Sequence, residues 1–195
     1  METRPANESQ LTCLQERIAR GDQAAFRELF HYFSAKLIQF SSAIVKNPDA
    51  AREIVDEVFI RIWRNRESAT TIQNIRVYLY TSVKNVSLSY LSARARENVL
   101  EPFDFFNVQL VEEESPEKKL ITAELMNRIH QAIDSLPPRC KMVFKLVRED
   151  GLSYREVAQI LNISTKTVDA QMVIAVRQIS ERVRPEFDFL PRRRK

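Results

Sequence analysis

The scarcity of glycine restricts most strongly the folds that this chain can adopt. Only 2 of its 195 residues are glycine, whereas tight hairpins, phosphate-binding loops and strand–helix crossovers commonly need it. Apolar residues recur instead at helical spacing over long stretches, as at Leu29, Phe33, Leu37, Phe40 and Ile44. The chain is therefore predicted to be all-α.

The stretch from Leu136 to Val183 carries the pattern of a helix-turn-helix. Ser153 and Glu156 form an S-x-x-E capping box that predicts a helix start, and Asn162 tolerates the left-handed conformation that ends a helix. After a new hydroxyl cap, a longer helix is predicted with an apolar stripe of Val168, Met172, Ala175, Val176, Ile179 and Val183. Two helices joined by so short a turn can place the second one in the DNA major groove.

The same pattern would also fit a plain helical hairpin whose apolar stripe only packs in a core. Lys166 argues against that alternative, because a cation in the first helical turn opposes the helix dipole at a cost of roughly 0.3 to 1 kcal/mol. A DNA phosphate bound at that helix start would turn the cost into a gain. The residue therefore favours DNA binding.

The first half of the chain is predicted to form four helices. Gly21 and Asp22 end a short first helix and cap a second one, and Asn47 with Pro48 begins a third. Residues 66–74 are polar and threonine-rich and are predicted to be a surface loop, followed by a fourth helix from about residue 75 to 96. The outer face of the third helix is charged, with Arg52, Glu53, Asp56, Glu57, Arg61 and Arg64.

The fourth helix combines basic residues with Tyr78, Tyr80 and Tyr90. Basic and aromatic side chains together form a platform on which unpaired bases can stack. The tyrosines fit equally a helix that packs them in or near a core, and on the residues alone the core is the first interpretation.

Charge is segregated along the chain. Residues 1–96 hold 14 Lys and Arg against 10 Asp and Glu, residues 97–117 hold none against 7, and residues 118–195 hold 16 against 9. Two basic bodies joined by an acidic linker are predicted, and basic bodies attract nucleic acid. The predicted divisions are an N-terminal segment 1–23, a helical domain 24–96, a linker with its lead-in 97–127, a helix-turn-helix domain 128–184 and a basic tail 185–195.

Several other classes of protein lack their expected signals. Cys13, Cys140, His31 and His130 are dispersed, so neither a zinc site nor a disulfide framework is expected, and a reducing cytoplasm fits. No stretch approaches the ~20 apolar residues of a membrane span, and no metal-ligand cluster or Walker loop indicates an enzyme. The chain is expected to need no cofactor, to have no catalytic residues and to insert into no membrane.

Two sets of residues together resemble the extracytoplasmic-function group of bacterial sigma factors. The segment Leu136-Pro137-Pro138-Arg139-Cys140, the run from Glu149 to Ala158 and the run Thr165-Lys166-Thr167-Val168 resemble region 4 of that family. Residues 51–59 with Trp63, and then Tyr78-Leu79-Tyr80 with Asn85, look like region 2. The matches follow the family's order, and two of them flanking a linker are more specific than a lone helix-turn-helix.

The resemblance implies a dissociable subunit of RNA polymerase that selects and helps open promoters. In that family the helix matching residues 49–65 docks on the β′ coiled coil, region 4 also binds the β flap, and an anti-sigma factor holds the protein inactive. The residues implied in binding core polymerase are Arg52, Asp56, Glu57 and Trp63. Those implied in capturing single-stranded bases of the downstream promoter element are Thr71, Asn74, Arg76, Lys84 and Asn85. Those implied in binding the upstream element as duplex are Tyr154, Arg155, Lys166, Thr167, Asp169, Ala170, Gln171 and Arg177.

The predicted recognition helix departs from the family in its outer face, which is unusually apolar. Gln171 could pair with adenine, and Ala170 or Val173 could contact a thymine methyl, so A·T-leaning readout is predicted. The alternative function is a helix-turn-helix regulator that is not a polymerase subunit, but the first half of the chain lacks the α/β sensor domain expected of one.

Overall fold

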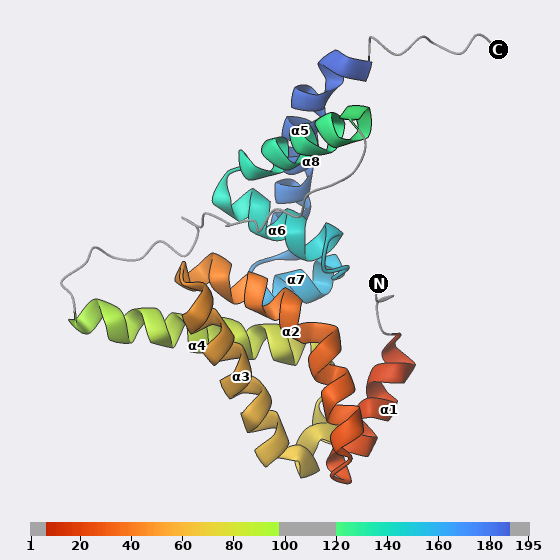
Figure 1. The fold of residues 1–195 in the computed structure, drawn as a ribbon, viewed down its shortest axis with the longest axis vertical. Coiled ribbons are helices and arrows are strands. Elements are labelled where there is room, and N and C mark those ends of the chain that lie inside the picture. Colours follow the sequence, from red (N-terminus) through yellow and green to blue (C-terminus); the bar gives the residue numbers. More distant parts are fainter. Residues whose placement is uncertain (1–6, 98–119, 188–195) are drawn as a thin grey trace. The chain divides into compact units, whose positions relative to one another are not determined.

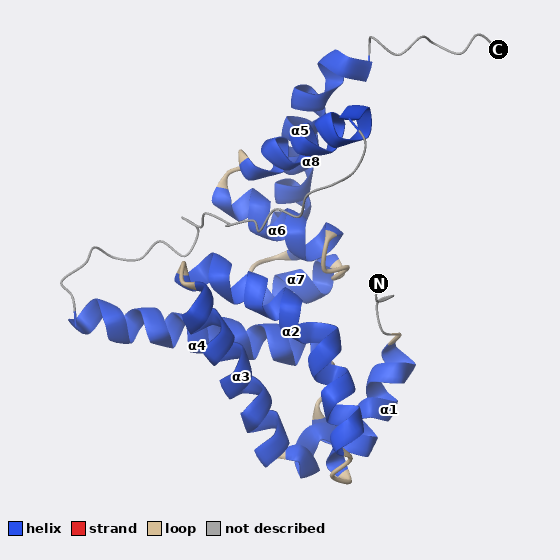
Figure 2. Ribbon diagram, in the orientation of Figure 1, coloured by secondary structure: helices blue, strands red, loops and turns tan. Residues whose placement is uncertain are grey.

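The computed structural model describes residues 7–97 and 120–187, and every regular element in these two ranges is helical. The elements are α1 (Glu8–Ala19), α2 (Gln23–Val45), α3 (Pro48–Arg64), the 3-10 helix η1 (Arg66–Thr71), α4 (Ile75–Glu97), α5 (Leu120–Asp134), α6 (Pro138–Arg148), α7 (Tyr154–Leu161) and α8 (Thr165–Phe187). Figures 1 and 2 show helices joined by short connections. The all-α prediction is confirmed.

The chain divides into two compact units, Met1–Val111 and Glu112–Lys195. In the first unit α2 packs against α3 and α4, while α1 packs against α2 and η1. Figure 1 shows α1, in red, beside the yellow turn that joins α3 to α4. Since Leu11, Leu14 and Ile18 are buried, α1 belongs to the core of this unit.

The helix starts of the first unit lie where the capping residues predict them. The Asp22 carboxylate accepts hydrogen bonds from the backbone N–H groups of residues 24 and 25 at the start of α2. The Asn47 amide oxygen accepts from residues 49 and 50 at 3.0 and 3.1 Å, with Pro48 in the first turn of α3. These side chains satisfy backbone donors that a helix start leaves unpaired.

The segment 66–74 differs from the surface loop that its composition predicts. Residues 66–71 form η1, and Ala69 is buried. Residues 67, 68, 70, 71 and 73 are exposed, as predicted for a surface segment, but the 3-10 helix and the buried Ala69 were not predicted, because the anchoring atoms are backbone carbonyls that accept from Gln15 of α1. A polar composition does not report contacts that the backbone makes.

The tyrosines of α4 have three different environments. Tyr80 is buried and meets the Phe40 ring edge-on, with ring centres 5.2 Å apart, whereas Tyr90 is half-buried. Tyr78 is 41% exposed. The interpretation of the tyrosines as core or half-buried side chains is confirmed for Tyr80 and Tyr90, and Tyr78 is the most exposed of the three.

Helix α8 is the centre of the second unit. It packs against α5, α6 and α7, and its buried stripe consists of Val168, Met172, Ala175 and Val183. Lys141 of α6 is buried, and its ammonium group pairs with Asp134 of α5. Fully burying a valine or methionine side chain contributes about 1.5–3 kcal/mol, so Val168, Met172 and Val183 fix α8 in the unit.

The turn between α7 and α8 has the predicted geometry. Ser153 and Glu156 form the capping box of α7, and the Ser153 backbone N–H donates to the Glu156 carboxylate at 2.8 Å. Asn162 ends α7 in the left-handed conformation, with φ 54° and ψ 50°. The Ser164 hydroxyl then accepts a hydrogen bond from the Thr167 N–H at 3.0 Å. The helix-turn-helix prediction is confirmed.

Two sequence predictions lie outside the described residues. They concern the acidic linker over residues 98–119 and the basic tail from residue 188 onward. None of the helices in the described ranges has the length and apolar character that a membrane span requires.

The left-handed residue between α7 and α8 gives a test of the fold. We expect Asn162→Val to destabilise the protein by about 1–2 kcal/mol, because a β-branched side chain clashes with the backbone at positive φ. Asn162→Gly should leave stability nearly unchanged, since glycine adopts this conformation freely. Urea unfolding of the full chain measures both variants, and equal stability of the valine and glycine variants would contradict the assignment.

Candidate functional site

The exposed face of α8 is largely apolar. Ala170, Val173, Ile174 and Arg177 follow one another at helical spacing and all are exposed, Val173 to 61% and Ile174 to 40%. Arg177 forms a solvent-exposed ion pair with Glu181, with Nε and Oε1 3.4 Å apart. Lys166, Thr167 and Asp169 are also exposed and lie near the start of the helix.

Val176 does not belong to the buried stripe for which it was predicted. Its side chain is 44% exposed. Residues 168, 172, 175 and 183 already cover the side of α8 that faces the other helices, and position 176 lies about 100° around the helix from position 175. The apolar surface of α8 is therefore wider than its core needs.

Gln171 lies on the inner edge of α8. Its side chain is half-buried, and its amide oxygen accepts a hydrogen bond from the Cys140 thiol of α6 at 2.8 Å. Burial raises the pKa of that thiol, which keeps it protonated and able to donate. Bidentate pairing with adenine needs both the oxygen and the nitrogen of the amide, and the hydrogen bond from Cys140 uses one of the two lone pairs of that oxygen and orients the side chain toward α6.

The start of α7 presents two further predicted residues. Tyr154 and Arg155 directly follow the Ser153 cap, and both side chains are exposed. An exposed helix start carries unpaired N–H groups and a partial positive charge that suit a phosphate. The starts of α7 and α8, with Arg155 and Lys166, therefore provide two possible anion contacts in one unit.

The outer face of α3 is charged, with an apolar residue at its centre. Arg52, Asp56 and Glu57 are exposed, and Glu57 pairs with Arg61 one turn later. Ile60 is 50% exposed among them. Since a single exposed apolar residue is normal on a protein surface, the charges rather than Ile60 characterise this face.

Trp63 lies at the edge of that face, next to Arg52 around the helix. Its ring lies against Phe26, with ring centres 5.0 Å apart, and beneath the Arg66 guanidinium at 5.2 Å. The side chain is half-buried, so its contacts mainly join α2, α3 and the start of η1.

The predicted single-strand residues fall into two groups. Thr71 and Asn85 are exposed, and Asn85 lies on the same face of α4 as Tyr78. Arg76 and Lys84, which were expected to point to solvent, are half-buried, and burial lowers the Lys84 pKa.

Asn74 acts as the cap of α4. Its side-chain oxygen accepts from the Val77 N–H at 3.0 Å, and its side chain is half-buried. Of the five residues predicted to contact single-stranded DNA, only Thr71 and Asn85 are thus exposed, and Tyr78 is exposed beside them in the sequence.

Two residues of this unit were missed by the sequence analysis. Ile60 could have been found, because it falls at the centre of the outer face when the charged residues of α3 are placed on a helical wheel. Gln15 had no such signal, since its partners are backbone carbonyls more than fifty residues away in sequence.

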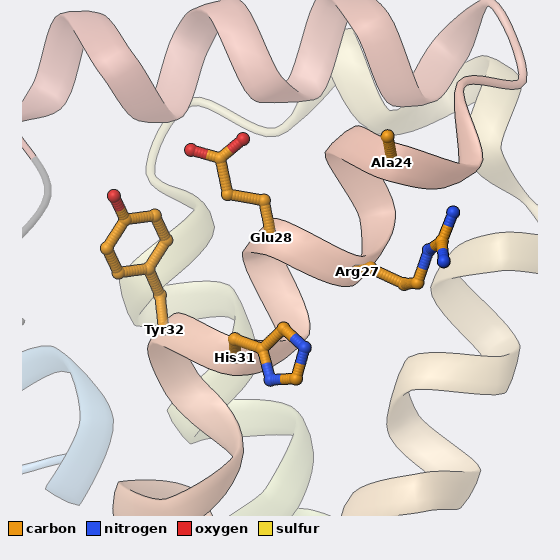
Figure 3. A pocket seen from close by; sticks show the side chains of 5 residues that line it. All are labelled: Ala24, Arg27, Glu28, His31 and Tyr32. Carbon is orange, nitrogen blue, oxygen red and sulfur yellow. The ribbon is translucent and has the colours of Figure 1, made fainter.

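A hollow of about 470 Å³ is lined by Ala24, Arg27, Glu28, His31 and Tyr32. Figure 3 shows that all five side chains project from one stretch of α2. In the described ranges no three His, Cys, Asp or Glu side chains gather in a way that could hold a metal ion.

Comparison with known families identifies both units. Residues 29–97 match the family described as Sigma-70 region 2, and residues 126–179 match Sigma-70, region 4. The first match includes the exposed faces of α3 and α4, and the second includes the helix-turn-helix.

Solved structures share the fold at low sequence identity. The structure of CnrH in complex with the cytosolic domain of CnrY has a TM-score of 0.55 and 18% identity, covering 88% of this chain and 96% of that one. The sigma factor RpoE in complex with the anti-sigma factor NepR from Bartonella quintana has a TM-score of 0.58 and 18% identity, covering 82% and 96%.

Curated relatives are more similar in sequence. The ECF RNA polymerase sigma-E factor of Escherichia coli is 30% identical over 179 residues, which are 88% of this chain and 93% of the relative. The sigma-E factor of Haemophilus influenzae is 29% identical over 179 residues, which are 88% and 94%. A regulator that is not a polymerase subunit is not favoured, because the similarity extends over both units. The chain therefore belongs to the extracytoplasmic-function group of the sigma-70 family, the sigma factors of transcription initiation.

Proposed function

We propose that this sigma factor binds core RNA polymerase in the cytoplasm, brings it to promoters and helps to open them. The observation that carries the proposal is the division of exposed surfaces between the two units. The second unit presents a recognition helix whose outer face is free of protein packing. The first unit presents exposed polar and aromatic residues around the start of α4 and a separate charged face on α3.

Opening of the promoter would need no catalytic residue. Unstacking costs a few kcal/mol for each base that leaves the duplex, and stacking on an aromatic side chain returns about 1–3 kcal/mol per base. Tyr78 is the exposed tyrosine of α4, with Thr71 and Asn85 exposed nearby in sequence. We infer that these three side chains contact the unpaired bases of the downstream promoter element.

The protein partners follow from the family and from the exposed surfaces. The face of α3 with Asp56, Glu57 and Ile60 would dock on the β′ coiled coil, and the second unit would contact the β flap. CnrH and the Bartonella RpoE were both solved as complexes, with the cytosolic domain of CnrY and with the anti-sigma factor NepR. We propose that this chain likewise has an anti-sigma partner.

The first prediction concerns the phosphate contact at the start of α8. Lys166→Ala should weaken binding of duplex promoter DNA by a similar factor for all sequences. The slope of the logarithm of the binding constant against the logarithm of the salt concentration should become shallower by about one. Arg182→Ala, on the same helix and also exposed, should leave the salt dependence unchanged. Titrations with holoenzyme at several salt concentrations measure both slopes, and equal slopes for wild type and Lys166→Ala would exclude the contact.

The second prediction concerns thymine methyl groups. If Ile174 packs on the methyl group of a thymine in the upstream element, replacing that thymine with deoxyuridine removes the methyl group. Wild-type binding should then weaken by about fourfold, or about 0.8 kcal/mol for a methyl-sized group. The Ile174→Ser variant should lose this sensitivity. Val176→Ser, exposed on another side of α8, should keep it. A wild-type protein that is insensitive to every such replacement would show that the apolar face does not read thymine.

The third prediction concerns core polymerase. Asp56→Lys should weaken binding to core at least about tenfold, because a reversed charge meets like charge across a complementary interface. Glu16→Lys changes an exposed acid on α1 and serves as the control. Fluorescence anisotropy with labelled full-length protein gives both affinities, and core binding that is equal in the two variants would place the docking face elsewhere.

A further inference from the structure

Gln15 of α1 holds the connection between α3 and α4 from the inside. The residue is only 6% exposed, and its amide nitrogen donates to the Ala69 carbonyl and to the Ile72 carbonyl, both at 2.8 Å. The partners lie 54 and 57 residues further along the chain. One amide group has two N–H donors, so both of them are used on this connection.

The two bound carbonyls flank the residues that face outward. Ala69 is buried, whereas Thr70 and Thr71, between the two anchoring points, are exposed. The Thr71 hydroxyl donates to the Ser68 carbonyl at 2.7 Å, which fixes the turn from within. The Gln15 contacts therefore determine how far these threonines project from the unit.

The beginning of the connection is held by other contacts. Arg66 stacks on Trp63 and donates from Nη1 to the Trp63 carbonyl at 3.2 Å. Gly21, in the turn between α1 and α2, lies next to the Arg66 side chain: a Cβ atom at this position would be 3.8 Å from Arg66 Nε. Helix α1 and the turn after it thus lie along both ends of η1.

A short 3-10 helix needs such external support. Its hydrogen-bond geometry is poorer than that of an α-helix, so an isolated segment of six residues has little stability of its own. Backbone carbonyls held by a buried amide lose the freedom to rotate. Buried polar atoms also cost free energy when their partner is removed.

We propose that Gln15 is a positioning residue for base recognition, which sets the conformation in which residues 70–74 receive unpaired bases of single-stranded DNA. This inference rests on the proposed function of that segment. It adds that α1, which is expected to contact no base, determines the base preference of the downstream element through two hydrogen bonds.

The test compares base preference in two variants that each lose buried hydrogen bonds of the first unit. Gln15→Met keeps the length of the side chain and removes both donors. Ser87→Ala removes a buried hydrogen bond between Ser41 and Ser87 of the same unit, on α2 and α4, and leaves the Gln15 contacts intact. Full-length proteins are assembled with core polymerase and incubated with single-stranded DNA randomised over the downstream element, and the bound molecules are sequenced.

We expect Gln15→Met to bind core and duplex upstream element like wild type, and to lose about tenfold of its preference between bases, which corresponds to about 1.4 kcal/mol. The Gln15→Asn variant, whose shorter side chain reaches one carbonyl at most, should have a base preference between those of wild type and Gln15→Met. It takes the place of Gln15→Met in the test if the methionine variant does not fold. Ser87→Ala should retain the full preference.

Two results would overturn the inference in distinguishable ways. If wild type shows a base preference and the Gln15 variants show the same one, Gln15 has only a structural role and the proposed function stands. If wild type has no base preference on single-stranded DNA, the segment does not capture bases, and the positioning role fails together with that part of the proposed function.

Discussion

The second unit depends on a division of α8 into two faces. Val168, Met172 and Ala175 are buried against the other helices, and because these contacts lie on one side of α8, the opposite face remains available to a ligand. The left-handed Asn162 makes the division possible, because it turns the chain sharply enough for α7 and α8 to pack closely. The exposed face of α8 can then vary in sequence without loss of the fold. The fold therefore tolerates the apolar Val173 and Ile174 at the centre of this face.

Most of the fold was predictable because helix boundaries are set locally. Asp22, Asn47 and Ser153 cap the helices that follow them, and the apolar spacing of α2 and α3 identifies their buried faces. The predictions were incomplete where a contact joins residues distant in sequence. The connection at 66–74 is ordered by Gln15 of α1, and no local pattern in a polar, threonine-rich stretch indicates that its backbone is bound from behind.

The candidate site was predictable to a smaller extent, since exposure of a side chain depends on what packs around it. Composition placed three tyrosines on α4, but only packing distinguishes the buried Tyr80 from the exposed Tyr78. Gln171 has the chemistry to read adenine, yet its amide oxygen binds the Cys140 thiol. Residue type therefore indicated which units we propose to contact DNA, and the structure was needed to show which of their side chains are exposed.

Run-off transcription with purified core polymerase tests the central claim most directly. The full-length protein is added to core and to a library of bacterial promoter fragments, and the transcripts are sequenced from their starts. We expect transcripts that begin at defined sites only when the protein is present, with a shared upstream and downstream element at fixed spacing. A stable protein that neither binds core nor produces any start of its own would contradict it.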